Sequence, residues 1–429
     1  MKALVKLAVL EIGAVLLVVM PVAVAHAQLR GPVVVPQSGI ERPGDVGVKA
    51  HTDMLLVPIS GSRNVAATVH SQTTSAPPLP GFYFDTPASI ACAYELDSQV
   101  RGFCNPNTAT ENPSGGSRAI AVVDAYDDPF AAADLAEFSR QFALPAAKFT
   151  VVFARGFRPP VDPTGGWEFE ESLDIEWSHA LAPNAAIYLV EAASSSLSDL
   201  LLAESVAGGI VGNQGGGEVS NGWGSSEFSG ELGLDRFFTS PGVVYLAASG
   251  DAPGIEYPAA SPNVIAAGGT SLNRDVPAAT LNESAWQDSG GGPSAFEPRP
   301  SYQSAIASTV GDARGTPDVS VTANPNSGVW VYDTVPVELS AGFPTQFAAG
   351  WIVAGGTSVS TTMLAGMINS RGDFASTSAQ ELTTVYGNLG SANFFDIAIG
   401  NCGPYGGYAA VAGWDFCTGV GSPAGAGGF

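Results

Sequence analysis

Two carboxyl groups four residues apart could transfer protons together. Glu170 and Asp174 lie in the segment 167–181, whose apolar spacing predicts a helix, so both side chains share one face. With Leu173 and Trp177 around them, the carboxyls would titrate as a unit, one accepting a proton while the other holds it in position. Taken alone, this spacing is more common on solvated helix faces.

A serine at a turn between a predicted strand and a predicted helix could act as a nucleophile. Ser358 follows Gly355-Gly356-Thr357, where the apolar strand 351–354 ends and the helix 358–369 begins. The N-terminus of a helix stabilises negative charge that develops beside it. A serine that only caps the helix is the commoner case. The Gly-x-Ser-x-Gly turn of α/β-hydrolases is not matched, because Ser360 occupies its last position.

An aspartate follows a predicted buried strand at the place where parallel sheets usually bind ligands. Asp251 comes after the strand 243–249 and Gly250. While protonated, its carboxyl could donate a hydrogen bond to an oxyanion. An ordinary turn aspartate could occupy the same position. Together with the carboxyl pair and Ser358, however, Asp251 points to acyl transfer by a serine.

Histidine is difficult to place as the base for such a serine. His51 and His70 lie in an N-terminal leader with little predicted structure, and His179 is rotated off the face that Glu170 and Asp174 share. We expect His179 to be a packing or surface residue. A Ser-His-Asp site is therefore hard to assemble, and a carboxylate base remains.

The elements that would position these residues alternate between apolar strands and helices. Strands are predicted at 119–125, 149–154, 185–191, 243–249, 264–267 and 351–354, and helices at 129–142, 167–181, 196–210 and 358–369. Buried strands separated by helices predict a mainly parallel sheet with helices on both faces. The fold class is α/β, in one large catalytic domain.

The charge of the chain excludes some partners and chemistries. The formal net charge of -23 over 429 residues repels phosphate backbones and anionic lipids, so nucleic acid is excluded as a partner. The lysines are Lys2, Lys6, Lys49 and Lys148, and none stands three residues after a serine. A Ser-x-x-Lys nucleophile is therefore excluded.

The N-terminus has the pattern of a secretory signal peptide. In residues 1–27, Lys2 and Lys6 precede an apolar stretch that ends in Ala25-His26-Ala27. We expect export to the medium or periplasm and no stable membrane association after cleavage. Glu11 within the apolar stretch leaves an uncleaved anchor as the alternative.

Four cysteines form two local pairs in the sequence. Cys92 stands near Cys104, and Cys402 stands near Cys417. This spacing suits two disulfides in an oxidising compartment, although other pairings remain possible.

Several motifs occur in the order of one known peptidase family. They are Glu170-x-x-Leu173-Asp174-Ile175, Ala180-Leu181-Ala182-Pro183-Asn184-Ala185, Ser249-Gly250-Asp251, Tyr257-Pro258-Ala259-Ala260-Ser261-Pro262, Gly290-Gly291-Gly292 and Gly356-Thr357-Ser358. From about Thr86 to Pro423 the chain resembles the sedolisins, serine-carboxyl peptidases that share the subtilisin fold. Residues 86–429 are then the peptidase domain, and residues 28–85 a short leader, linker or vestigial prosegment.

The resemblance implies a role for each candidate residue. Ser358 would be the nucleophile, Glu170 the general base, and Asp174 the residue that holds Glu170. Asp251 would complete the oxyanion hole, and Asp124 would be a supporting acid. The implied function is that of a secreted endopeptidase, expected to be a monomer, which acts on proteins or peptides. We expect an acidic optimum, because Asp251 donates only while protonated.

The resemblance also implies a calcium site near the C-terminus. Asp396 and Asp415 would supply carboxylate oxygens, and Ile397, Val411 and Gly413 would supply main-chain carbonyls. A shell made only of oxygen suits Ca²⁺. Val411 stands where the family pattern has glycine.

Two departures from the family pattern motivate other functions. Sedolisins commonly carry a long prosegment, whereas the segment between signal and matching region is short, and Asn221 stands where a substrate-binding strand usually has serine. One alternative is therefore an inactive peptidase-fold protein that binds peptides. A further alternative is a secreted hydrolase of esters.

Overall fold

The computed structural model describes residues 32–40, 47–57, 77–79, 82, 84–96, 104–273, 282–339, 347–403 and 407–429. The predicted signal peptide, residues 1–27, and His70 lie outside these residues. In the part of the chain that is described, no helix has both the length and the apolar character needed to cross a bilayer.

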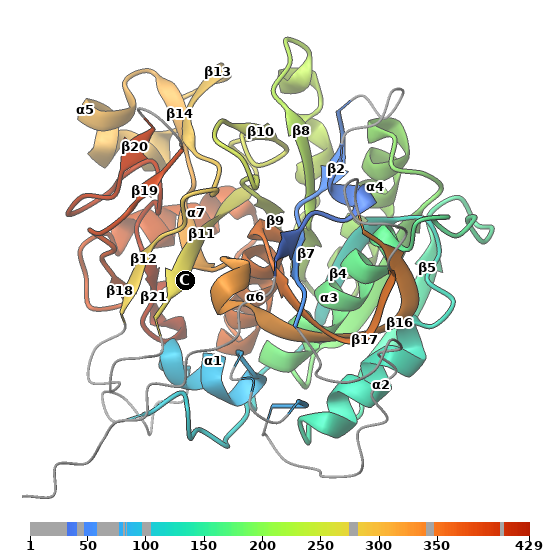
Figure 1. The fold of residues 1–429 in the computed structure, drawn as a ribbon. Coiled ribbons are helices and arrows are strands. Elements are labelled where there is room, and N and C mark those ends of the chain that lie inside the picture. The colour runs from blue at the N-terminus through green and yellow to red at the C-terminus, as the bar shows by residue number, and fades with distance from the viewer. Residues whose placement is uncertain are drawn as a thin grey trace, which may run out of the picture.

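A mostly parallel sheet forms the centre of the molecule (Figure 1). Its strand order is β12-β11-β9-β7-β4-β6-β5, with β15 paired to β11; β12 is antiparallel to β11, and the other pairs are parallel. The strands are β4 (Ala119–Ala125), β5 (Lys148–Phe153), β6 (Ala186–Ala192), β7 (Gly217–Asn221), β9 (Val243–Ala248), β11 (Ile265–Leu272), β12 (Glu283–Ala285) and β15 (Val319–Thr322).

Helices cover both faces of this sheet. Alternate residues of β4 show the two faces: Ile120 and Val122 pack in one core with α2 (Ala131–Gln141), α3 (Gly166–Leu181) and α6 (Thr357–Arg371). Ala121 and Val123 belong to the other core, with α4 (Leu197–Asn213). The predicted α/β architecture is confirmed.

A second sheet is antiparallel and includes strands from the N-terminal leader. Its order is β1 (Val33–Val34), β3 (Asp53–Leu55), β17 (Phe347–Gly355) and β16 (Val329–Glu338). The predicted strand at 351–354 is therefore present, but it lies outside the parallel sheet. An apolar run specifies a buried strand and not the direction of its neighbours.

The leader also contributes a strand to a third sheet. β2 (Lys49–Ala50) pairs with β8 (Trp223–Ser226), which also pairs with β10 (Glu256–Tyr257). Figure 1 shows β2 in blue beside β8. Most side chains between residues 48 and 55 are buried, so this part of the leader packs into the fold.

Smaller elements complete the described structure. The remaining helices are α1 (Pro87–Ala93), α5 (Ala307–Val310) and α7 (Ser378–Gly387), and the remaining strands are β13 (Gly292–Pro298), β14 (Ala313–Thr316), β18 (Phe394–Phe395), β19 (Asn401–Cys402), β20 (Tyr408–Ala409) and β21 (Ser422–Pro423). Short 3-10 helices occur at Gln37–Gly39, Glu231–Gly233, Asp235–Phe238, Ser301–Ile306, Pro325–Ser327 and Ala426–Gly428.

Candidate active site

Helix α3 carries the carboxyl pair. The helix begins beside Asp162, whose Oδ2 accepts the backbone N–H groups of Gly166 at 3.2 Å and Trp167 at 3.3 Å. Glu170 and Asp174 are both 0 % exposed. This burial excludes a solvated acidic helix face, and it puts both carboxyl groups inside the protein.

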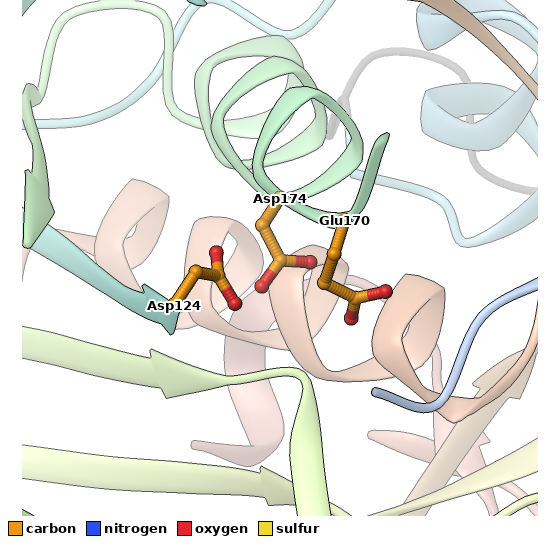
Figure 2. Close-up of side chains that lie close together, drawn as sticks. All are labelled: Asp124, Glu170 and Asp174. Atoms are coloured by element: carbon orange, nitrogen blue, oxygen red, sulfur yellow. The ribbon is translucent and has the colours of Figure 1, made fainter. Parts of the chain in front are cut away.

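A third carboxyl joins this pair from the central sheet. Asp124 lies near the C-terminal end of β4 and is also 0 % exposed. One oxygen from each of Asp124, Glu170 and Asp174 lies within 4.8 Å of the other two. Figure 2 shows the three side chains close together, Glu170 and Asp174 on one helix and Asp124 at the end of a strand. Oxygens at this spacing could surround a cation, but burial with no ion pair in the described residues favours carboxyls that retain protons.

Ser358 lies at the start of α6, directly after β17. The turn between them passes through Gly356, whose φ of 98° lies in the left-handed region that glycine tolerates. The Ser358 hydroxyl donates a hydrogen bond to the carbonyl oxygen of Gly222 at 2.8 Å.

Gly222 is the point at which the proposed catalytic side chains meet. A Cβ at this position would lie 2.2 Å from Oε1 of Glu170, 2.9 Å from Oγ of Ser358 and 3.1 Å from Oδ2 of Asp174. Glycine is required here because of this close approach. The same atoms show that α3 and α6 bring the carboxyl pair and the serine together.

Asp251 lies on the other side of the serine, after β9. Its Oδ1 accepts hydrogen bonds from the backbone N–H and the hydroxyl of Thr357, each at 2.7 Å. Its Oδ2 is buried and has no hydrogen-bond partner in the described part of the chain. A protonated Oδ2 is therefore available to donate to another oxygen.

Burial raises the pKa values of these carboxyls. It raises the pKa of Glu170 to about 7, against the opposing effect of the hydroxyls of Ser358 and Thr52. Burial, and then the charges of Asp124 and Glu170, raise the pKa of Asp174 well above its usual range. Burial, followed in importance by the charge of Asp53, also raises the pKa of Asp251 well above its usual range. These carboxyls thus keep protons at pH values where exposed carboxyls are ionised.

The described histidines differ in their position relative to this cluster. Nε2 of His179 lies 2.9 Å from the carbonyl oxygen of Pro145, and burial lowers the pKa of its ring. It is the packing residue that the sequence suggests. His51, by contrast, lies beside the cluster: its backbone N–H donates to the carbonyl oxygen of Gly222 at 2.9 Å, and its carbonyl oxygen accepts the N–H of Ser358 at 3.1 Å. The sequence alone does not place it there. The alternation Val48-Lys49-Ala50-His51 was the available signal, because it is typical of a short strand.

Asn221, which departs from the family pattern, has a structural contact. Its Nδ2 donates to the carbonyl oxygen of Leu246 at 3.0 Å and links β7 to β9. The adjacent β8 therefore keeps its place beside the catalytic cluster.

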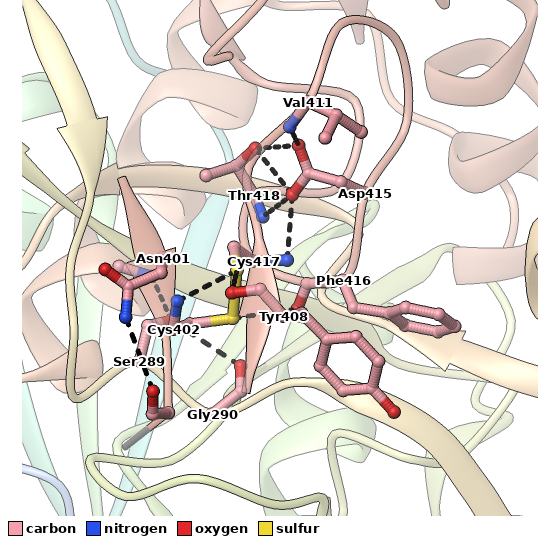
Figure 3. Close-up of a disulfide and its surroundings, with 12 residues drawn as sticks. Ser289, Gly290, Asn401, Cys402, Tyr408, Val411, Asp415, Phe416, Cys417 and Thr418 are labelled. Carbon is pink, nitrogen blue, oxygen red and sulfur yellow. Dashed lines mark hydrogen bonds between the residues drawn. A yellow bond between two sulfur atoms is a disulfide. The ribbon is translucent and has the colours of Figure 1, made fainter. Parts of the chain in front are cut away.

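Four of the five residues expected to hold calcium lie in or contact one loop near the C-terminus, and the fifth, Ile397, follows Asp396 in the chain. Asp396 accepts the backbone N–H of Gly413, at 3.0 Å to Oδ2, and Asp415 accepts that of Val411 at 2.9 Å. Figure 3 shows Val411 and Asp415 in this loop. Two carboxylates from separate segments thus converge on the loop that carries Val411 and Gly413. This donor set fits a hard cation such as Ca²⁺.

Both cysteine pairs suggested by the spacing form disulfides. Cys92 is bonded to Cys104, and Cys402 to Cys417. The second disulfide lies next to Asp415, whose Oδ1 accepts the backbone N–H of Cys417 at 2.8 Å (Figure 3). It therefore ties the loop to the strand β19.

Two proteins with known names are similar to this chain in sequence. Kumamolisin from Bacillus sp. (strain MN-32) is 28% identical over 387 residues, which cover 79% of this chain and 62% of kumamolisin. Sedolisin from Pseudomonas sp. (strain 101) is 32% identical over 183 residues, which cover 39% of this chain and 28% of sedolisin. The chain thus spans less than two thirds of the length of these relatives. No family profile matches it.

The fold is also shared with a solved structure. Pseudomonas sedolisin, a serine-carboxyl proteinase complexed with two molecules of pseudo-iodotyrostatin, has a TM-score of 0.62 at 21% identity, over 80% of this chain and 95% of that chain. The structural likeness shows the fold. Together with the similarity to kumamolisin and sedolisin in sequence, it supports the sedolisin family with a subtilisin-like fold.

Proposed function

We propose that the chain is a secreted serine-carboxyl endopeptidase that cleaves proteins or peptides in acid. Ser358 is the nucleophile, Glu170 takes the proton of its hydroxyl, Asp174 positions Glu170, and Asp251 completes the oxyanion site. The observation that carries this proposal is the convergence of Glu170, Asp174 and Ser358 around Gly222.

The reaction follows from these positions. Oγ of Ser358 bonds to the carbonyl carbon of the substrate, and its proton passes to Glu170. The negative charge on the former carbonyl oxygen is stabilised by the backbone N–H of Ser358 and the protonated carboxyl of Asp251. Glu170 then gives its proton to the leaving amine. Water hydrolyses the acyl-enzyme by the same route.

Two carboxyl titrations set the expected pH profile. At high pH, activity falls as Asp251 loses the proton that it donates; at low pH, it falls as the Glu170–Asp174 pair becomes fully protonated. Burial raises the pKa of Glu170 to about 7 in this structure, where the side chain is fully buried. Wherever water reaches this carboxyl, the effect of burial on its pKa is smaller, so the acid limb moves to lower pH.

Hydrolysis of a denatured protein between about pH 3 and 8 tests the proposal. We expect activity that peaks in acid and is abolished in Ser358→Ala. The matched control Ser304→Ala changes an exposed serine and should keep full activity. A folded parent that binds peptides without cleaving them would support the inactive binding protein instead, and cleavage of esters alone would support the esterase.

The remaining assignments accompany this function. We propose residues 1–27 as the signal peptide, residues 28–85 as a short leader and residues 86–429 as the peptidase domain, acting as a monomer. We also propose that Asp396, Ile397, Val411, Gly413 and Asp415 hold Ca²⁺, supported by the convergence of both carboxylates on one loop. The ion would brace this loop and has no role in proton transfer.

A further inference from the structure

The loop that follows β8 is fastened to β13 by a carboxyl group. β8 ends at Ser226, and Glu227 comes next in the chain. The hydroxyl of Ser294 on β13 donates to Oε1 of Glu227, and the backbone N–H of Ala295 donates to Oε2 at 3.0 Å. Ser294 is itself held, because its Oγ accepts the backbone N–H of Glu297 at 2.8 Å. Both oxygens of Glu227 thus bind the end of β8 to β13.

A second carboxyl from the same loop meets the first. Glu231 is 0 % exposed, and its Oε2 accepts the backbone N–H of Phe228 at 2.8 Å. Its Oε1 has no N–H or hydroxyl partner among the described residues, and its carboxyl lies within hydrogen-bonding reach of Glu227. Two carboxyls can share a hydrogen bond only when one of them holds a proton. Both oxygens of Glu227 already accept hydrogen bonds, so the shared proton lies on Glu231.

The surroundings of Glu231 favour this proton. The titratable and charged groups that face it or its acidic neighbours are Glu227, Asp235 on the next 3-10 helix, Tyr257 on β10, Glu297 on β13 and Arg314 on β14. The guanidinium of Arg314 is already bound to both oxygens of Asp318. Burial, against the opposing N–H of Phe228, raises the pKa of Glu231 to about 8, and the charge of Glu227 adds to this rise. Burial, followed by the charge of Asp235, raises the pKa of Glu297 to about 7.

The loop adjoins the strand that meets the proposed nucleophile. Gly222, directly before β8, accepts the hydroxyl of Ser358 at 2.8 Å. Ser225 of β8 pairs with Tyr257 of β10, whose ring packs against that of Phe228 with the centroids 5.9 Å apart. The contact of the loop with β13 therefore fixes one end of β8, and the chain beside the other end binds Ser358.

We propose that Glu231 is a positioning residue of the peptidase: the proton that it donates to Glu227 holds β8 against β13, and loss of this proton releases the loop 227–238 and weakens substrate binding. The edge of β8 accepts an extended chain, because β2 pairs with it antiparallel. A peptide that adds to this edge binds less tightly when the strand is not held in place. The effect on substrate rests on the peptidase function proposed above, whereas the carboxyl contact does not.

The contact is present in acid and is lost as pH rises. The closed loop keeps the proton of Glu231 up to about pH 8, whereas an exposed glutamate releases it near about pH 4. Between these values, opening of the loop releases one proton, so the equilibrium constant for opening rises about tenfold for each pH unit. The loop thus holds β8 in the acid conditions in which the proposed catalysis operates.

Hydrogen exchange tests the loop without any need for activity. Peptides of the full chain that cover residues 226–238 are followed by mass spectrometry from about pH 5 to 8, and exchange is corrected for its chemical dependence on pH. We expect the corrected exchange of the parent to rise about tenfold per pH unit. Corrected exchange that does not change with pH would overturn the inference.

Substitutions at Glu231 separate the proton from the side chain. In Glu231→Gln the amide donates to Glu227 and accepts from Phe228 with nothing to titrate, so corrected exchange should not vary with pH. Glu231→Leu cannot donate, so its loop should exchange rapidly at every pH. The control Glu137→Gln changes a carboxyl that pairs with Arg140 on α2, and it should keep the slope of the parent. The same slope in Glu231→Gln as in the parent would contradict the role of Glu231.

Steady-state kinetics test the effect on substrate. The ratio of the KM of the parent to that of Glu231→Gln should grow to about tenfold by about pH 8. Over the same range kcat should fall alike in both, because Asp251 is unchanged. Equal KM values at every pH would show that the loop does not position β8. If the loop responds to pH as expected but no peptide is hydrolysed, the proposed function fails, whereas the proton-dependent contact is supported.

Discussion

Two buried carboxyl sites of this protein deal with charge in opposite ways. At Asp318, Nη1 of Arg314 donates to Oδ1 at 2.8 Å and Nη2 donates to Oδ2 at 2.6 Å, and both side chains are 0 % exposed. The hydroxyl of Tyr386 also donates to Asp318, at 2.8 Å. At Asp124, Glu170 and Asp174, no described residue forms an ion pair, and the oxygens of Asp124 and Asp174 lack a hydrogen-bond partner among the described residues. Only the hydroxyls of Ser358 and Thr52 act on Glu170.

The difference separates a structural carboxylate from carboxyls that could exchange protons. A carboxylate held by a bidentate arginine keeps its charge and its position, so it has no proton to exchange. Buried carboxyls without a cation can avoid mutual repulsion only by retaining protons, which leaves them able to give and take protons. The cluster on α3 and β4 is therefore suited to proton transfer, and the Arg314–Asp318 pair is suited to holding elements together.

The largest expected effect is the loss of activity in Glu170→Gln. Glutamine has nearly the same size but cannot accept the serine proton, so we expect hydrolysis to fall by about 10²–10⁴-fold. The midpoint of thermal unfolding should not fall, because the substitution removes a buried ionisable group. Peptide hydrolysis measured beside thermal unfolding checks both statements. Activity within about twofold of the parent would show that Glu170 is not the base.

At the Arg314–Asp318 pair we expect a substitution to lower stability instead of activity. Asp318→Asn leaves the guanidinium of Arg314 buried without its counter-charge, so we expect the free energy of unfolding to fall by about 3–5 kcal/mol. Urea unfolding followed by circular dichroism measures this. A control with both residues replaced, Arg314→Met with Asp318→Leu, should recover much of the loss. If Asp318→Asn unfolds like the parent, the pair does not hold this region together.

The sequence is sufficient to predict the elements that carry the proposed catalytic residues. The spacing of Glu170 and Asp174 on a helix, and the entry to α6 through Gly356, follow from local patterns that depend on few residues. The parallel sheet follows from apolar strands separated by helices. These features are local, so one chain is enough to find them.

The pairing of the leader strand β2 with β8 could not be predicted in the same way. β2 has two residues, and its partner β8 lies far along the chain, so no periodicity links Lys49 to Gly224. The contact of His51 with Glu256 depends on that pairing and could not be found before it. The antiparallel pairing of β17 with β3 escaped prediction for the same reason.

The carboxylates of Asp396 and Asp415 would be neutralised in a third way, by a bound cation. If Ca²⁺ binds at the loop of Asp396 and Asp415, a chelator should lower the free energy of unfolding by about 3 kcal/mol relative to calcium at a hundred times its dissociation constant. Differential scanning calorimetry with and without calcium measures this change. In Asp396→Asn the loss of unfolding free energy on adding the chelator should be much smaller. An equal response in this variant, or none in the parent, would contradict the calcium assignment.

The pH dependence of stability should show a more gradual effect, from a buried carboxyl outside the proposed catalytic residues. Burial raises the pKa of Glu204 on α4 to about 8, whereas in an unfolded chain this carboxyl titrates near about 4. The folded protein therefore holds this proton as pH rises through that window, while the unfolded chain releases it. Stability is fully present below about pH 4 and is lost towards about pH 8, by up to about 1.4 kcal/mol per pH unit.

Urea unfolding at several pH values should show this slope in the parent and a shallower slope in Glu204→Gln, which keeps the side-chain size but does not titrate. Asp128 and Glu168, whose pKa values burial raises to about 7 and about 8, should still contribute to the slope in that variant. Unchanged slopes would show that Glu204 is ionised in the folded protein. Burial without a cation would then not be sufficient to hold protons, and the contrast between the Arg314–Asp318 pair and the catalytic cluster would lose its physical basis.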